Sequence, residues 1–159
     1  RRKFGFEIVK LREGEPLPFN QGEIDILICN SVIEHVTWSK EECLSNQIPE
    51  HEWRCRSLAN QRAFADEIRR ISKSYFIHTP NRHFPIEAHT WLPLVNWLPH
   101  NQTVSLIKLT DRWWVKYCGI ADWYLLDVQS LRSLFPEATI IPEKFLGIAK
   151  SFIAYHLNA

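Results

Sequence analysis

The amino-acid sequence predicts an α/β fold for this chain of 159 residues. Residues 24–29 form a short, β-branched and almost wholly apolar run, which is typical of a strand covered on both faces of a parallel sheet. A helical pattern over residues 50–72 separates this run from a second strand at residues 75–78, and a connection through a helix favours parallel pairing. The short link between the last two predicted strands, residues 139–141 and 151–156, favours an antiparallel edge.

The amino-terminal third contains the first two predicted strands. Residues 7–11 alternate enough to form a strand, with Glu13 and Gly14 beyond its carboxyl end. A turn over residues 19–22 then leads into the apolar strand, which ends in Asn30 and Ser31. Because ligands of open α/β sheets bind beyond the carboxyl ends of strands, residues 30–35 are the first place to expect a site.

Capping and breaking residues delimit the later elements. Thr37 or Ser39 is placed to cap a short helix, and Phe64, Ile68 and Ile71 share one face of the long helix that follows. Pro80 ends the strand over residues 75–78, because proline has no amide hydrogen for the ladder. The remaining predictions are a helix over 127–135 capped by Asp127 and a hairpin-like connection at 145–147.

Between these elements, residues 82–124 form an insert rich in tryptophan and proline. Base stacking on nucleic acid is one interpretation of the aromatic residues, but no basic stripe accompanies them. The insert is therefore predicted to act as a lid, as the wall of a pocket or as ordinary core.

Composition excludes several classes of partner. Hydrophobic residues make up 45% and charged residues 23% of the chain, as in a globular protein, and the net charge of +1 gives no electrostatic reason to expect a nucleic-acid or membrane partner. The four cysteines, Cys29, Cys43, Cys55 and Cys118, have neither metal-type nor redox spacing. We therefore expect buried or inert thiols and a cytoplasmic location.

Five segments, taken in order and spacing, resemble a known family. They read Arg-Glu-Gly-Glu-Pro-Leu-Pro-Phe, Glu-Ile-Asp-Ile-Leu-Ile-Cys-Asn-Ser-Val-Ile-Glu-His-Val, Glu-Ile-Arg-Arg-Ile-Ser, Thr-Pro-Asn-Arg and Leu-Phe-Pro-Glu-Ala, at residues 12–19, 23–36, 67–72, 79–82 and 134–138. The chain resembles the carboxyl-terminal two-thirds of a class I S-adenosylmethionine-dependent methyltransferase, closest to the methyltransferase type 11 group. The resemblance implies a Rossmann-like sheet, mostly parallel, with an antiparallel carboxyl-terminal edge strand.

The resemblance also implies where the cofactor S-adenosylmethionine would bind. Glu13, with Gly14 beside it, stands where the family has an acid that accepts from the adenine amino group, although a solvated turn acid is the plainer interpretation. Asn30, Ser31 and Val32 stand where family members line the methionine part of the cofactor.

The sequence lacks other parts of the family's site. The family's Gly-rich turn after the first strand and its ribose-binding acid after the second have no counterpart among these residues. We therefore expect residues 1–159 to be a partial methyltransferase domain without its amino-terminal strands. Cofactor binding should be weak or absent unless the missing part is supplied elsewhere.

His35 is the candidate catalytic residue, because an imidazole titrates near neutrality and could take a proton from an acceptor hydroxyl. The alternative is that it only packs and caps the next helix. Glu34 and His35 could also bind a divalent metal with a further acid or histidine, but the sequence identifies no third ligand, so we predict no metal site.

Four residues beyond the strand at 75–78 are predicted to face the substrate, with a solvated loop as the alternative. They are Arg82, His83, Glu87 and His89. The expected function is methyl transfer to a small-molecule or glycan-like acceptor, with neither a nucleic acid nor a membrane as partner. A non-catalytic interaction module that keeps part of the fold is the rival hypothesis. A dinucleotide or nucleotide-sugar enzyme is disfavoured because the sequence contains no Gly-x-Gly-x-x-Gly.

Overall fold

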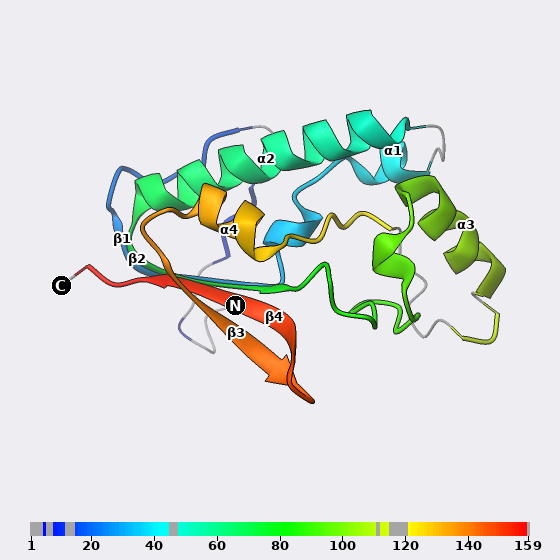
Figure 1. Ribbon diagram of the computed structural model, residues 1–159. Coiled ribbons are helices and arrows are strands. Elements are labelled where there is room, and N and C mark those ends of the chain that lie inside the picture. The colour runs from blue at the N-terminus through cyan, green and yellow to red at the C-terminus, as the bar shows by residue number, and fades with distance from the viewer. Residues whose placement is uncertain are drawn as a thin grey trace.

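The fold is of the α/β class, as predicted. In the computed structural model, the described residues are 5, 8–11, 15–44, 48–110, 112–114 and 121–158. They form a four-stranded sheet with the strand order β1-β2-β4-β3 (Figure 1). The strands and the long helix are β1 Ile24–Asn30, α2 Glu50–Ile71, β2 Ser72–Pro80, β3 Thr139–Phe145 and β4 Ile148–His156.

The prediction of a mostly parallel sheet is wrong. Only β1 and β2 pair in parallel, joined through α2, whereas β2 pairs antiparallel with β4 and β4 antiparallel with β3. The two-residue link Leu146–Gly147 makes β3 and β4 antiparallel, since a parallel pair needs a crossover of a dozen residues or more. The unexpected antiparallel pair arises because β4 lies next to β2 and runs opposite to it. The last strand is antiparallel, as expected, but it lies inside the sheet and leaves β3 at the edge.

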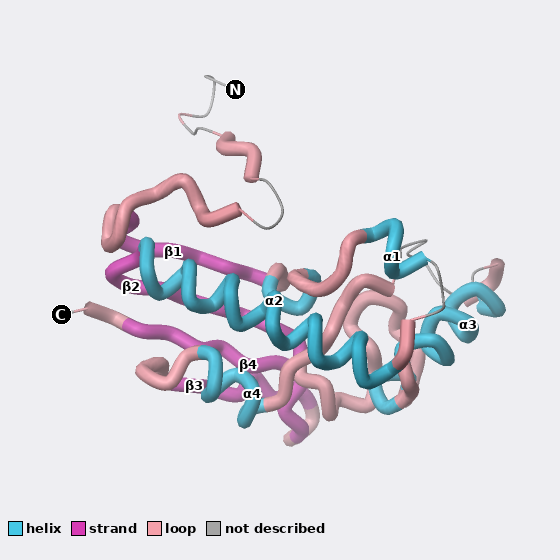
Figure 2. Tube along the Cα trace, turned by 90° about the horizontal axis from the view of Figure 1, so that it is seen from above, coloured by secondary structure: helices cyan, strands magenta, loops and turns pink. Residues whose placement is uncertain are grey.

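One face of the sheet carries the main hydrophobic core. Helices α2 and α4, the latter Val128–Leu134, lie on the same side of the strands (Figures 1 and 2). The helix residues Ile68 and Leu131 are fully buried against strand residues such as Ile77 and Ala154. The predicted helix face is thereby confirmed, because Ile68 and Ile71 are buried and Phe64 packs against the core.

The other face of the sheet is open. Ile26 and Ile28 of β1 are 69% and 72% exposed, and Phe76 and Ile141 on the same face are exposed as well. The prediction that β1 is covered on both faces is therefore wrong for the described chain. Its apolar run reflects one buried face and one bare apolar face, which a hydrophobicity pattern cannot distinguish from two buried faces.

The segment before β1 runs beside the end of α2 instead of extending the sheet. Residues 8–11 are exposed and lie outside any strand, so the strand predicted at 7–11 is wrong for its described part. The side chain of Arg70 donates to the carbonyl oxygens of Leu17 and Phe19 at 3.1 and 2.8 Å. Gly22, with φ of 64°, turns the chain and donates its N–H to the carbonyl of Arg70.

The predicted helix caps are confirmed. Ser39 precedes α1, Lys40–Leu44, and its hydroxyl accepts from the Glu42 N–H while the Glu42 carboxylate accepts from the Ser39 N–H. Asp127 accepts from the Ser130 N–H at 2.7 Å and so starts α4.

The aromatic insert forms a second, smaller cluster beside α3, His100–Thr110. Leu92, Val95, Val104, Ile107 and Trp123 belong to it. Core packing therefore explains part of the aromatic content, while Trp91, Trp97, Trp113 and Trp114 are exposed. None of the helices in the described part of the chain has the length and apolar character needed to cross a bilayer.

Two of the cysteines behave as predicted. Cys29 and Cys43 are buried free thiols, and burial raises their pKa to about 11 and about 12. Cys55 is a free thiol too, but it is exposed on α2. Cys118 lies outside the described residues.

Candidate functional site

Polar side chains gather where the parallel strands β1 and β2 end. Directly after β1, Ser31 adopts a left-handed backbone conformation with φ of 51°, which is uncommon for a residue with a side chain. Its N–H donates to the carbonyl of His78 in β2 at 2.9 Å. The chain then turns into the short 3-10 helix η2, Ile33–His35, which carries two of the site's side chains.

Glu34 is a fully buried carboxyl group. One of its oxygens accepts from the hydroxyl of Thr79, at the end of β2, at 3.0 Å. The other, Oε1, has no hydrogen-bond partner among the described residues. The buried amide of Gln61 donates to the carbonyl of Ile33, the residue before Glu34, and to the carbonyl of Tyr124, whose own N–H donates to the carbonyl of Glu34.

His35 is held by a carboxylate. Its Nδ1 lies 2.8 Å from Oδ1 of Asp122, and its side chain is 31% exposed. The hydrogen bond to Asp122 raises the pKa of His35, partly offset by burial, and the charges of Asp122, Glu34 and Glu87 act in the same upward direction.

His89 is held in the same way by the buried Glu87. Its Nδ1 lies 2.6 Å from Oε1 of Glu87, and Oε2 of Glu87 accepts from the N–H groups of His89 and Thr90 and from the Thr90 hydroxyl. Burial acts to raise the pKa of Glu87, but the hydrogen bonds and charge of His89 outweigh it, and the pKa is lowered. The ring of His89 stacks on Trp123 with centroids 4.6 Å apart.

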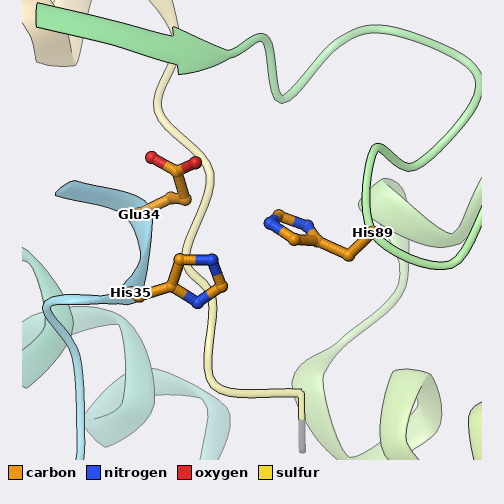
Figure 3. A group of neighbouring side chains, drawn as sticks. All are labelled: Glu34, His35 and His89. Atoms are coloured by element: carbon orange, nitrogen blue, oxygen red, sulfur yellow. The ribbon is translucent and has the colours of Figure 1, made fainter. Parts of the chain in front are cut away.

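The two imidazoles meet edge to face. Their ring centroids are 4.8 Å apart at an interplanar angle of 83°, and Figure 3 shows them approaching from η2 and from the loop after β2. Ligand-type atoms of Glu34, His35 and His89 all lie within 4.8 Å of one another. His89 is thus the third residue that the Glu34–His35 pair lacked in the sequence.

The predicted substrate residues divide into two groups. Glu87 and His89 reach the cluster, with Glu87 as the group that orients His89. Arg82 instead donates to the hydroxyl of Tyr124 at 3.1 Å and lies over its ring. His83 is exposed, and the carboxylate of Asp127 lies 3.9 Å from it.

The predicted cofactor residues lie at the surface beside the cluster. Asn30, Ser31 and Val32 are exposed at the end of β1, while Glu13 and Gly14 lie outside the described residues. Ser31 also borders a largely apolar groove of about 420 Å³. The groove's other walls include Asn81, Phe84, Ile86, Glu87 and Trp91.

Sequence reasoning missed Asp122, Thr79 and Trp123 as parts of the site. Thr79 belongs to the segment 79–82 that carries the family resemblance, but no role in a site was predicted for it. Asp122 and Trp123 lie 87 or more residues after His35, in a stretch without a motif. They reach the site because the chain returns beside η2, where the Tyr124 N–H donates to the Glu34 carbonyl. No protein-family model, curated protein or solved structure matches the chain.

Proposed function

We propose that the chain is part of an S-adenosylmethionine-dependent methyltransferase. One observation carries the proposal. Two of the five segments that resemble the family, residues 23–36 and 79–82, lie at the ends of neighbouring parallel strands. In an open α/β sheet, the crevice beyond such strand ends is where ligands bind.

Bound S-adenosylmethionine supplies an electrophilic methyl group on sulfur, and the protein's task is to position the acceptor against it. The apolar groove beside Ser31 has walls suited to an aromatic or aliphatic acceptor, with Phe84, Ile86 and Trp91 along it. His35 supports proton removal, because Asp122 occupies its Nδ1 and leaves Nε2 as the acceptor nitrogen. A carboxylate that holds one ring nitrogen fixes the tautomer of the other.

The fit to the cofactor is partial. Asn30, Ser31 and Val32 are accessible at the strand end where its methionine part would lie. The described residues supply no Gly-rich turn and no acid after a preceding strand for the ribose hydroxyls. The described residues therefore account for the acceptor side of the proposed active site more completely than for its cofactor side.

A non-catalytic interaction module is the alternative, and the open sheet face favours it. The exposed side chains of Ile26, Ile28, Phe76 and Ile141 form an apolar surface of the kind that marks contact with other protein elements. The two proposals differ in cofactor binding: the methyltransferase is expected to bind S-adenosylmethionine, and the interaction module is not.

Calorimetry of the natural gene product that contains these residues separates the two. With S-adenosylmethionine and its demethylated product S-adenosylhomocysteine as ligands, the proposal predicts saturable binding of both. Glu13→Ala should weaken that binding, because the resemblance gives Glu13 the adenine contact, whereas Glu52→Ala on the exposed side of α2 should not. Absence of binding to a folded protein would remove the methyltransferase proposal and leave the interaction module.

A further inference from the structure

We propose that Glu34, His35 and His89 form a binding site for a divalent transition-metal ion. Each side chain offers one ligand atom, and these atoms lie within 4.8 Å of one another. Two imidazoles and a carboxylate are a common protein ligand set for zinc and for non-haem iron. The inference concerns metal binding itself and holds whether or not the chain takes part in methyl transfer.

The hydrogen bonds around both histidines match those of metal ligands. A metal-bound imidazole commonly donates its other ring N–H to a carboxylate, which fixes the ring and raises its basicity. Here Asp122 holds Nδ1 of His35 and Glu87 holds Nδ1 of His89, at 2.8 and 2.6 Å. Both Nε2 atoms are therefore left for a ligand.

Glu34 provides an independent observation. Its side chain is fully buried, yet Oε1 has no hydrogen-bond donor among the described residues. A buried carboxylate oxygen without a partner is costly, and a coordinated cation would satisfy it. The other oxygen is bonded to Thr79, so the carboxylate already has a fixed orientation.

The charge of the surroundings favours a cation. Three carboxyl groups, those of Glu34, Glu87 and Asp122, lie around two imidazoles. In the part of the chain that the structure describes, the cluster's hydrogen bonds do not involve a lysine or arginine. The guanidinium of Arg82, in the insert, is engaged by Tyr124. A divalent ion would offset this local excess of negative charge.

The ligand set indicates the class of ion and of chemistry. Imidazole nitrogen suits Zn²⁺, Co²⁺ and Fe²⁺ better than Mg²⁺ or Ca²⁺, which prefer oxygen. Three protein ligands leave a position open for water or an acceptor oxygen, as in catalytic zinc sites. The side chains of His35 and His89 are 31% and 16% exposed, so solvent can reach that position. Metal binding at His35 Nε2 excludes its use as a proton acceptor, and the ion would then acidify the bound oxygen.

Titration of the tag-free 159-residue chain with Co²⁺ tests the site. The Cys55→Ser background removes the exposed thiol on α2 as a competing ligand. We expect one equivalent of Co²⁺ to bind, with visible d–d bands of a nitrogen–oxygen site and without the near-ultraviolet bands of thiolate coordination. Zn²⁺ should displace the Co²⁺ and bleach these bands.

Variants locate the site. His89→Gln, His35→Gln and Glu34→Gln should each weaken Co²⁺ binding at least about tenfold, while His83→Gln, an exposed histidine in the same loop region, should bind as the parent does. Circular dichroism checks that each variant is folded. His89→Gln, at a partly exposed residue, keeps the test decisive if Glu34→Gln does not fold. Absence of stoichiometric binding to the folded parent, or binding that survives His89→Gln, would overturn the proposal.

Discussion

At the scale of single residues, the site is defined by two histidines whose Nδ1 atoms are bonded to carboxylates. Asp122 holds His35 and Glu87 holds His89. Gln61 ties η2 to the segment over residues 121–127 through its hydrogen bonds to the carbonyls of Ile33 and Tyr124. Such fixed rings are pre-organised, which is the condition for proton transfer or for metal coordination.

Removal of the Asp122 carboxylate should lower the pKa of His35. The main upward influence on this pKa is the hydrogen bond from Nδ1 to Asp122, so Asp122→Asn leaves burial as the larger remaining influence and favours the neutral ring. Nitrogen-detected NMR titration of the imidazole measures the change. Glu143→Gln, which removes a partner of the distant His78, serves as the matched control. An unchanged His35 pKa in Asp122→Asn would show that the 2.8 Å contact is not formed in solution.

The sequence could locate this site only in part. His35, Glu87 and His89 were predicted because they follow strand ends, and this reasoning needs no tertiary contact. The role of Glu87 as a support for His89 could not be predicted, since Glu, His and Arg residues in a loop all look equally able to face a substrate. Asp122 could not be predicted, because its contact spans 87 residues and no local pattern encodes it.

At the scale of elements, α2 joins the sheet to the aromatic insert. Its amino-terminal half carries Trp53, whose ring stacks on His100 of α3 at a centroid distance of 3.7 Å. Glu50 accepts from the His100 N–H at 2.8 Å and so caps α3 from a neighbouring helix. The ring Nε2 of His100 is buried without a partner among the described residues.

His100 should make the fold less stable in mild acid. Burial lowers the pKa of His100 to about 4, below the ordinary value of 6.5, so the unfolded chain binds a proton that the folded chain excludes. The free energy of unfolding is therefore at its full value well above pH 6.5 and falls as the pH drops from about 6.5 to about 4, by about 3 kcal/mol.

Urea unfolding at pH 7 and pH 4.5 checks this prediction. His100→Phe keeps a ring against Trp53 and removes the titrating group, so its free energy of unfolding should depend less on pH than that of the parent. His51→Phe, on the exposed surface of α2, should leave the parent's dependence unchanged. Equal pH dependence in His100→Phe and the parent would contradict a buried, neutral His100.

Element positions were largely predictable because their signals are local. The caps Ser39 and Asp127, the breaker Pro80 and the helical period of α2 each depend on residues within a few positions. The prediction of a strand at 7–11 is wrong for its described part. Five alternating residues do not determine whether a neighbouring strand is available for pairing.

At the scale of the whole molecule, the sheet has one packed and one bare apolar face. Helices α2 and α4 cover Ile77 completely, whereas Ile28 in the neighbouring strand is 72% exposed. The sequence could not show this difference, and it could not show that the final hairpin places β4 between β2 and β3. Both depend on which elements pack together and not on the pattern of any one strand.

Paired isoleucine substitutions test which face is packed. Ile77→Ala should lower the free energy of unfolding by about 3 kcal/mol, because it leaves a cavity in the core. Ile28→Ala removes the same atoms from the bare face and should cost less than about 1 kcal/mol. Chemical denaturation at pH 7 measures both, and an equally large loss for Ile28→Ala would show that this face is covered in solution.

NMR tests whether the ligand site lies at the carboxyl ends of β1 and β2. Amide spectra of the ¹⁵N-labelled natural gene product that contains these residues, recorded during titration with S-adenosylhomocysteine, detect even weak binding and locate it. We expect shifts concentrated in residues 30–36 and 79–82, with the β3–β4 turn at Leu146 and Gly147 unchanged. A folded protein that shows no shifts at millimolar ligand, or shifts confined to that turn, would contradict this location of the site.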